Sequence, residues 1–338
     1  MQSVKFLVLR FSSIGDIVLT TPIIRGLKQQ VENSEVHFFT KPAFKEILTA
    51  NPYVDKLHVL EDDLNGQLKK MKEEQYDYII DLHKNLRTLK VKSGLKVISF
   101  TFDKLNFQKW LIVNFKIDKL PPLHIVDRYY EAVEVFDVED DKKGLDYFIP
   151  KEDQVAVSSL STDLRENEYL ALVLGAHHNT KMLTEEKIHS VISNIHHPVV
   201  LLGGKDDYEF GESIQKKHQG NVINTCGKFS INQSASIINQ SRVVVSPDTG
   251  MMHIATALKK PLISVWGNTI PEFGMYPYYP NALSAIFEVK GLSCRPCSKL
   301  GYKQCPKNIS NVSKTLIPPI LFQKLKNSGN NPECEKPF

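Results

Sequence analysis

Two kinds of segment alternate along the chain: short β-branched runs and longer amphipathic stretches. The short runs have the composition of strands, and the longer stretches repeat their apolar residues with the period of a helix. In the first part of the chain, the predicted strands are KFLVLR, EVHFFT, KLHVL, DYIIDL and KVISF. A helix is predicted between each successive pair of the first four strands, and the first of these helices begins at about Asp16. This alternation predicts βαβ units and therefore a parallel sheet.

The pattern starts again after a polar, acidic segment at 138–151 and a predicted helix at 152–167. The later strands are YLALVLG, PVVLLGG, NVINTCG, RVVVS and PLISVWG, again separated by helices. We therefore predict an N-terminal domain at 1–155, a second domain at 156–315 and a closing helix with a flexible tail at 316–338. Because parallel sheets bind ligands beyond the carboxyl ends of their strands, we expect the site between the two domains.

Composition and charge narrow the class of protein. The formal charge of +4 on 338 residues is too small to indicate nucleic acid, and no nucleic-acid motif accompanies it, but it permits a locally basic cleft for an anionic substrate. The N-terminus lacks the pattern of a signal peptide, and no window has the roughly 18 apolar residues of a membrane span. We expect a cytoplasmic protein for which any membrane association would be peripheral.

The cysteines favour reduced thiols. There are five, an odd number for a disulfide framework, in a chain without secretory signals. Cys294, Cys297 and Cys305 cluster as C-x2-C-x7-C, but neither Cys334 nor a histidine has the standard spacing of a fourth zinc ligand. We favour ordinary thiols in a compact loop, with a metal site as the alternative.

The stretch VVVSPDTGMMHIATALKKPLISVWG joins a strand at 242–246, a helix from about Gly250 to Leu258 and a strand at 262–266. Asp248, Thr249 and Gly250 stand where the first strand meets the helix, whose free amide groups would bind an anion such as phosphate. His253 lies on the same face of the first turn. Alternatively, Asp248 or Thr249 only caps the helix and His253 is a surface histidine.

Three further loops follow predicted strands. Asp16 opens a helix, where a carboxylate either caps the first turn or serves as a general base at the mouth of the cleft. Lys181, before a helix predicted from about Thr184, is either solvated or neutralises a diphosphate. Gly203 and Gly204 permit a tight turn or the approach of a flat base. The first loop does not match G-x-G-x-x-G, which removes the main support for nicotinamide binding.

Basic residues gather in the first domain. Lys84, Arg87 and Lys90 belong to a run that continues to Lys119 and is interleaved with Phe107, Trp110 and other aromatic residues. The mixture suits an acidic acceptor or an anionic membrane surface. The alternative is a solvated face beside core aromatics.

Several of these stretches together resemble the heptosyltransferase family of bacterial glycosyltransferases. RFSSIGDIVLTTPIIRGLK is similar to the family's first strand, loop and helix, and SPDTGMMHIATALKKPLISVWGNTIP is similar to its most specific signature. YDYIIDLHKNLRT, HIVDRYYEAV and LSCRPCSKLGYKQCP also resemble family segments. One departure is Lys181-Met182-Leu183-Thr184, where the family often has Lys-x-Trp-Pro.

The resemblance implies a GT-B architecture of two Rossmann-like domains and an inverting, metal-independent transfer without a cofactor. It implies that Asp16 is the base and that Lys181 lies beside the donor phosphates. The donor-binding residues that we expect are Ser13, Gly15, Thr180, Gly203, Gly204, Asp248, Thr249, Gly250, Met251 and His253. The acceptor-binding residues that we expect are Lys84, Arg87 and Lys90.

The expected function is transfer of a sugar to the inner core of lipopolysaccharide, with heptose from ADP-heptose as the leading case. The expected partners are thus a nucleotide sugar and an anionic lipopolysaccharide-core acceptor, with peripheral contact at the inner face of the inner membrane left open. The alternatives are a GT-B sugar-nucleotide epimerase, which needs no glycan acceptor, and a nucleotide-sugar-binding protein without turnover. Retention of Asp16 and Lys181 disfavours the latter, since a pure binder needs no base.

Overall fold

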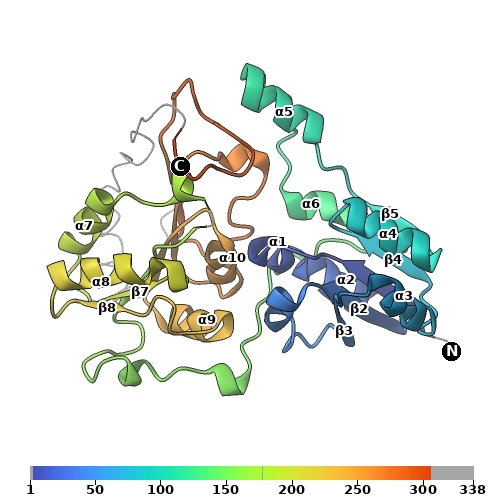
Figure 1. Cartoon of the computed structure of the whole chain (residues 1–338), viewed down its shortest axis with the longest axis horizontal. Helices are drawn as coiled ribbons and strands as arrows, with labels where there is room; N and C mark the ends of the chain where they lie inside the picture. Colours follow the sequence, from blue (N-terminus) through green and yellow to red (C-terminus); the bar gives the residue numbers. More distant parts are fainter. Residues whose placement is uncertain (1–2, 177, 306–338) are drawn as a thin grey trace.

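The computed structural model describes residues 3–176 and 178–305, which form two α/β domains lying side by side (Figure 1). The first domain has a parallel sheet in the order β3-β2-β1-β4-β5. Its strands are β1 (Val4–Leu9), β2 (Ser34–Thr40), β3 (Lys56–Val59), β4 (Tyr78–Asp81) and β5 (Ile98–Thr101). The strand order reverses between β1 and β4, so the carboxyl ends of these strands open a crevice for a ligand.

Alternate residues of β1 face opposite sides of this sheet and build two cores. Phe6 and Val8 pack toward α2 and α6, whereas Leu7 and Leu9 pack toward α3 and α4. The helices of this domain are α1 (Ile14–Val18), α2 (Thr21–Gln30), α3 (Leu64–Lys72), α4 (Leu86–Leu95), α5 (Asn106–Phe115) and α6 (Ile125–Tyr130). Because apolar side chains cover both faces, the central strand is apolar throughout rather than alternating.

The second domain has a parallel sheet in the order β11-β10-β9-β6-β7-β8. Its strands are β6 (Leu170–Val173), β7 (Val199–Leu202), β8 (Val222–Asn224), β9 (Val243–Pro247), β10 (Leu262–Trp266) and β11 (Ala285–Glu288). Its helices are α7 (Glu185–Ser193), α8 (Tyr208–Lys217), α9 (Ile231–Gln240) and α10 (Gly250–Ala257). The sequence predicts each of these strands except β11, a half-exposed edge strand whose short apolar run carries a weak signal.

The helix predicted at 152–167 is wrong. The structure has only short 3-10 turns there, η3 (Lys151–Asp153) and η4 (Val157–Ser159). Hydroxyl side chains compete with helical hydrogen bonding in this segment, as where Ser159 Oγ donates to the carbonyl of Ala156 at 2.7 Å. The amide of Val155 donates to Ser236 Oγ on α9 at 3.0 Å, so the segment is fixed by docking rather than by helical periodicity.

Other short 3-10 turns occur along the chain. They are η1 (Pro42–Ile47), η2 (Glu134–Phe136), η5 (Asn179–Lys181), η6 (Lys205–Asp207) and η7 (Pro271–Phe273). The first of them replaces the helix predicted between β2 and β3. The predicted closing helix and tail at 316–338, which include Cys334, lie outside the described residues.

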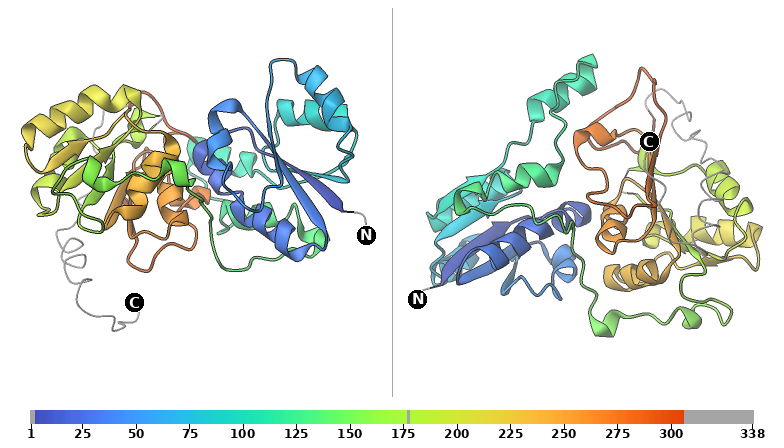
Figure 2. Two further views of the ribbon diagram at one scale, coloured as in Figure 1. Left: turned by 90° about the horizontal axis from the view of Figure 1, so that it is seen from below. Right: turned by 180° about the vertical axis from the view of Figure 1, so that it is seen from behind.

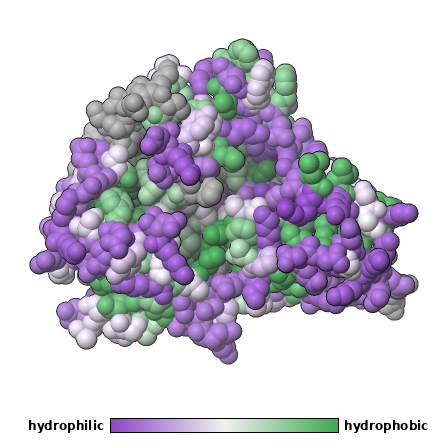
Figure 3. Space-filling model, viewed as in Figure 1, coloured by the Kyte–Doolittle hydropathy of each residue, from purple (hydrophilic) through white to green (hydrophobic). Residues whose placement is uncertain are grey.

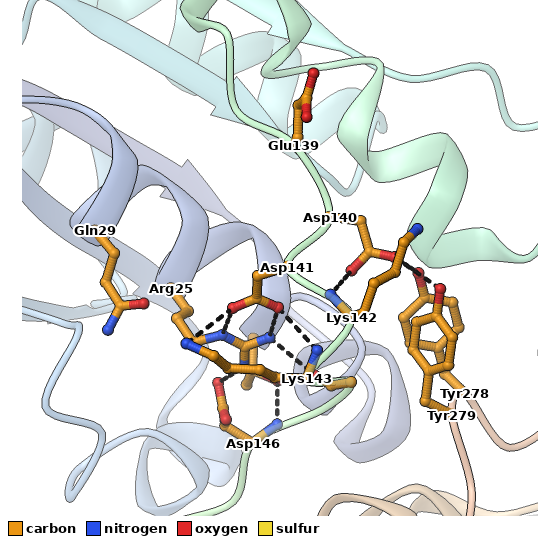
Figure 4. A network of polar contacts seen from close by, with 12 residues as sticks. Arg25, Gln29, Glu139, Asp140, Asp141, Lys142, Lys143, Asp146, Tyr278 and Tyr279 are labelled. Atoms are coloured by element: carbon orange, nitrogen blue, oxygen red, sulfur yellow. Dashed lines mark hydrogen bonds and ion pairs between the residues drawn. The ribbon is translucent and has the colours of Figure 1, made fainter.

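A network of polar contacts anchors the segment that connects the two domains and contains Asp140, Asp141 and Asp146 (Figure 4). Arg25 of α2 is buried and pairs with Asp141 and Asp146 of this connection, with Nη2 2.7 Å from Asp141 Oδ1. Asp140 Oδ2 lies 3.0 Å from the hydroxyl groups of Tyr278 and Tyr279 in the second domain. The connection is therefore fastened to both domains.

The two domains remain side by side when the molecule is viewed from below and from behind (Figure 2). The predicted boundary at residue 155 falls between the last strand of the first sheet and β6. Within the described part of the chain, no helix is long and apolar enough to cross a membrane.

Candidate functional site

The first turns of α1 and α10 meet between the domains. A Cβ atom placed on Gly250 would lie 2.6 Å from Ile14 Cβ, and one placed on Gly15 would lie 2.5 Å from His253 Cδ2. Side chains at these two positions would push the helices apart, so the glycines allow backbone to approach backbone. This contact brings Asp16 of one domain close to the first turn of α10 in the other.

Asp16 is held in place by Arg10 and Ser13. Arg10 Nη2 lies 2.7 Å from Asp16 Oδ1, while Asp16 Oδ2 accepts hydrogen bonds from Ser13 Oγ at 2.7 Å and from the Ser13 amide at 3.1 Å. Arg10 is itself buried and donates to the carbonyl of Leu82 at 2.6 Å and to the Tyr129 hydroxyl at 3.0 Å. The buried arginine thus fixes the orientation of the carboxylate.

The helix begins at Ile14 with Ser13 as its N-cap, so Asp16 is at the third helical position and the N-cap interpretation of Asp16 is wrong. Its carboxylate instead bonds back to the Ser13 amide, as in a capping box. Burial raises the pKa of Asp16, but Arg10, the Ser13 hydrogen bonds and nearby His253 outweigh it, and the net pKa is lowered. The side chain is 21% exposed and carries a negative charge at neutral pH.

On the facing side, Asp248 is bound by side chains rather than by the helix. Lys181 Nζ lies 2.6 Å from Asp248 Oδ2, and the Thr269 hydroxyl donates to the same oxygen at 2.9 Å. Thr249 is the N-cap of α10, but its side chain makes no capping hydrogen bond and its hydroxyl lies 3.2 Å from Ser246 Oγ. The interpretation of Asp248 as the cap is therefore wrong, and Thr249 occupies the N-cap position without capping the helix through its side chain.

His253 is buried rather than on the surface, so the alternative of a surface histidine is also wrong. Its ring lies against Gly15, and its Nδ1 has no hydrogen-bond partner among the described residues. Burial lowers its pKa to about 4, against the opposing influence of Asp248 and Asp16. The imidazole is therefore neutral at pH 7, and its Cδ2–Nε2 edge faces Gly15, whereas the unsatisfied Nδ1 is on the other edge of the ring.

The other predicted donor residues lie on loops of the second domain. The Thr180 hydroxyl exchanges hydrogen bonds with the backbone of Tyr302, at 2.8 Å from its nitrogen and 3.0 Å from its oxygen. A Cβ on Gly203 would lie 2.8 Å from Asp207 Cβ and 2.9 Å from Cys226 Sγ, whereas one on Gly204 would make only an ordinary contact, 3.7 Å from Asp207 Oδ2. Gly203 thus serves close packing. Met251, in the first turn of α10, packs against apolar cores of both domains.

The sequence interpretation missed Asp207. This residue follows β7, and its carboxylate accepts a hydrogen bond from the Gly204 amide at 2.7 Å. Its Oδ2 lies 2.1 Å from where a Cβ on Gly175, just beyond β6, would be. The carboxylate therefore stands at the carboxyl ends of β6 and β7, where Rossmann-like domains place the acid that binds ribose hydroxyl groups. The sequence did contain a signal for this residue, because Asp207 is an acidic residue that follows the second predicted strand of the domain.

A second group is a set of cations at the cleft, in which Arg128 and Lys299, missed in the sequence interpretation, join Lys104 and Lys109 of the predicted basic run. Arg128 of α6 is 2% exposed, and its Nε has no partner among the described residues. Its other nitrogens reach only the carbonyl oxygens of Asp103 and Phe273, at 3.3 and 3.4 Å. Lys109 lies nearby, and its pKa is lowered to about 7 by burial, Arg128 and Lys299. We name Lys104, Lys109, Arg128 and Lys299 the cleft cations.

The three predicted acceptor residues lie beside the end of β4 and on α4. Lys84 Nζ donates to the carbonyl of Phe102 at 3.0 Å, and the Arg87 guanidinium lies 5.4 Å from the centre of the Phe11 ring. Lys90 is exposed. Phe11 follows β1 in the loop that leads to Asp16, so Arg87 is placed near the cleft and Lys90 further out.

The cysteine cluster forms no recognisable metal centre within the described ranges, because no three His, Cys, Asp or Glu side chains there are arranged to hold an ion. The thiols of Cys294 and Cys297 are hydrogen-bonding neighbours. The pKa of Cys297 is raised, by burial first and then by Cys294.

The chain is similar to known proteins over most of its length. Residues 67–304 match the model of glycosyltransferase family 9 (heptosyltransferase). A lipopolysaccharide heptosyltransferase 1 from Campylobacter coli is 25% identical over 302 residues, which cover 82% of this chain and 86% of the relative. A lipooligosaccharide heptosyltransferase 2 from Haemophilus ducreyi is 24% identical over 300 residues, covering 80% and 85% of the two chains.

Solved structures share the fold. The ADP-heptose lipopolysaccharide heptosyltransferase II of E. coli superposes with a TM-score of 0.70 at 18% identity, covering 96% of this chain and 98% of that one. The E. coli heptosyltransferase WaaC, solved with ADP, gives 0.64 at 18% identity, covering 95% and 99%. The two Rossmann-like domains are therefore the expected GT-B architecture, and the chain belongs to glycosyltransferase family 9, the heptosyltransferase family.

Proposed function

We propose that this glycosyltransferase is an inverting enzyme that transfers heptose from ADP-heptose to the inner core of lipopolysaccharide in the cytoplasm. The observation that carries the proposal is the contact between α1 and α10, which sets an ionised carboxylate on Asp16 against a helix N-terminus in the other domain. The names of the curated relatives, which are lipopolysaccharide and lipooligosaccharide heptosyltransferases, support the choice of sugar and acceptor.

The donor diphosphate would bind at the first turn of α10. The amide groups of Gly250 and Met251 are not used by a side-chain cap, and the helix dipole favours an anion there. The Lys181 ammonium has three N–H donors and directs them toward the Asp248 carboxylate at 2.6 Å and its carbonyl at 3.3 Å, which leaves a donor for phosphate. His253 adds a buried, unpaired nitrogen, and Asp207 accepts from ribose hydroxyl groups.

In the reaction, the acceptor hydroxyl oxygen forms a bond to the anomeric carbon as the bond from that carbon to the diphosphate breaks. Asp16 takes the hydroxyl proton, and ADP leaves with the bonding electron pair. A single displacement of this kind inverts the anomeric configuration. Lys181 and the α10 amide groups stabilise the charge that develops on the diphosphate, so the transfer needs no metal ion.

The acceptor would enter on the side of the cleft cations. Lys104 and Lys109 lie close enough to Asp16 to feel its charge, and Arg128 and Lys299 lie next to Lys109. A buried arginine without a carboxylate partner is costly unless an anion neutralises it. The anionic groups of a lipopolysaccharide core supply that charge, while Lys84, Arg87 and Lys90 line the outer approach.

Mass spectrometry of products tests the function. The protein is incubated with ADP-heptose and a truncated, heptose-free core acceptor, with ADP-glucose and UDP-glucose as alternative donors and with ADP-heptose alone as a further control. We expect a mass gain of one heptose only with ADP-heptose and acceptor together. Transfer of another sugar would overturn the donor assignment, and an altered sugar nucleotide without acceptor would indicate an epimerase.

A further inference from the structure

Helix α5 exposes an aromatic face to solvent. Phe107 is 66% exposed, Trp110 48% and Phe115 59%. The rings contact one another, with the centre of Trp110 6.1 Å from that of Phe107 and 5.2 Å from that of Phe115. Figure 1 shows α5 extending away from the sheet of its own domain. We name Phe107, Trp110 and Phe115 the α5 aromatic face.

The opposite side of α5 faces the cleft. With 3.6 residues per turn, Ile112 and Lys109 lie across the helix from Phe107. Ile112 packs with Ile270 and Phe273 of the second domain, and Lys109 belongs to the cleft cations. One short helix therefore has an inner side at the cleft and an apolar outer side in water, the reverse of an ordinary surface helix.

The segment of the chain that contains α5 is strongly positive. Residues 84–119 contain nine Lys or Arg residues and only two acidic ones, Asp103 and Asp118, although the whole chain has a net charge of only +4. Lys116 and Lys119 follow the last residue of α5 and are exposed, and the Lys116 ammonium also donates to the carbonyl of Val113. Leu86 and Leu89, on α4 in the same segment, are exposed apolar side chains. Figure 3 shows green apolar groups among purple hydrophilic ones on the view that includes this part of the molecule.

We propose that the α5 aromatic face docks on an anionic lipid bilayer, and this inference rests on the proposed function because that function requires a lipid-linked acceptor. Tryptophan and phenylalanine beside lysine form the composition of segments that insert into the bilayer interface, where rings enter the acyl boundary and ammonium groups bind lipid phosphates. A protein partner without a negative surface would satisfy the rings but not the excess of positive charge. Docking would hold the cleft entrance at the membrane surface.

Vesicle binding tests the inference without any sugar transfer. The chain has two tryptophans, and Trp266 is 1% exposed, so a change in emission on adding vesicles reports Trp110. With phosphatidylglycerol vesicles we expect a blue shift of Trp110 emission and co-sedimentation of the protein, and with phosphatidylcholine vesicles at least tenfold weaker binding. A protein that does not bind, or binds both vesicles equally, overturns the proposal.

Matched variants distinguish vesicle binding through the α5 aromatic face from nonspecific binding through other exposed apolar side chains. Phe107→Gln with Phe115→Gln keeps the Trp110 reporter and should weaken vesicle binding at least tenfold. Leu283→Gln changes an exposed apolar side chain in the second domain and should leave vesicle binding unchanged. Equal vesicle binding by both variants would contradict docking through α5.

Circular dichroism and ADP titration identify variants that fail to fold. If the double variant fails to fold, Trp110→Gln replaces it, and its vesicle binding is measured by co-sedimentation. Failure of sugar transfer with intact vesicle binding would count against the proposed function alone. Transfer to a water-soluble acceptor without vesicle binding would count against docking alone.

Discussion

Asp16 combines two requirements in one side chain, since it completes an ion pair with buried Arg10 and faces the first turn of α10. Asparagine at position 16 still accepts a hydrogen bond from the Ser13 amide but can take neither the charge nor the proton. We expect Asp16→Asn to lower kcat by about 10²- to 10⁴-fold, to lower Tm because Arg10 loses its partner, and to keep ADP affinity within about twofold.

The measurement is kcat at saturating donor and acceptor, with melting and ADP titration on the same preparation. Ser13→Ala is the matched control, because it removes one hydrogen bond to the carboxylate and keeps the carboxylate itself; its kcat should fall by no more than about tenfold. Turnover of Asp16→Asn close to that of the parent would contradict the role of base.

Lys181 offers a second residue-scale prediction. Lys181→Ala removes a charge-assisted contact to the donor diphosphate, so ADP affinity should fall about 10- to 100-fold. Calorimetric titration with ADP measures this affinity. Lys187→Ala on α7 is the control variant, because it also removes one positive charge. The two variants binding ADP equally well would remove Lys181 from the diphosphate site.

His253 links ADP binding to pH. Burial lowers its pKa to about 4 in the free protein, and a diphosphate beside the ring would raise that pKa. Between about pH 4 and the raised pKa of the complex, ADP binding must therefore be accompanied by uptake of a proton at His253. The affinity for ADP should then increase as the pH falls through this range. Calorimetry in two buffers of different ionisation heat counts the protons. His253→Gln should bind ADP with a smaller proton uptake, and an unchanged uptake would place the diphosphate elsewhere.

At the scale of elements, the meeting of α1 with α10 depends on the absence of two side chains. A methyl group at Gly250 would lie 2.6 Å from Ile14 Cβ and Cγ2, in a region where both helices are packed. We expect Gly250→Ala to lower stability by about 1 to 3 kcal/mol and to lower kcat by separating Asp16 from the donor. Thermal melting and kcat check this together.

Gly204→Ala is the matched control for stability, because its nearest contact is 3.7 Å away at Asp207 Oδ2 and its backbone is extended. It should melt within a degree or two of the parent. Equal melting and turnover of Gly250→Ala and the parent would show that the two first turns do not have to touch.

For the whole molecule, the polar network at Arg25 fixes the chain between the domains. Arg25→Ala leaves Asp141 and Asp146 without their buried cation, and we expect a loss of about 3 to 5 kcal/mol in the free energy of unfolding. Lys28→Ala on the same helix breaks an exposed pair with Asp55 and should cost less than about 1 kcal/mol. Denaturant unfolding of both variants measures the difference, and similar losses would refute the special role of the buried network.

The sequence by itself determined the strands, the two-domain α/β class and the loops that carry Asp16, Lys181 and Asp248. It could do so because the buried parallel strands read as short apolar runs and their carboxyl-end loops stand out as polar breaks. It failed at 152–167, where docking on α9 overrides local preference, and at β11, whose apolar run is short.

Only the tertiary structure decided which groups share the site and in what state. Arg10 and Arg128 read as ordinary basic residues in the sequence, yet one is buried against Asp16 and the other is buried without a carboxylate partner among the described residues. Likewise, the burial of His253 against Gly15 joins residues more than two hundred positions apart. Charge state depends on burial and on neighbours brought together by folding, and local sequence records neither.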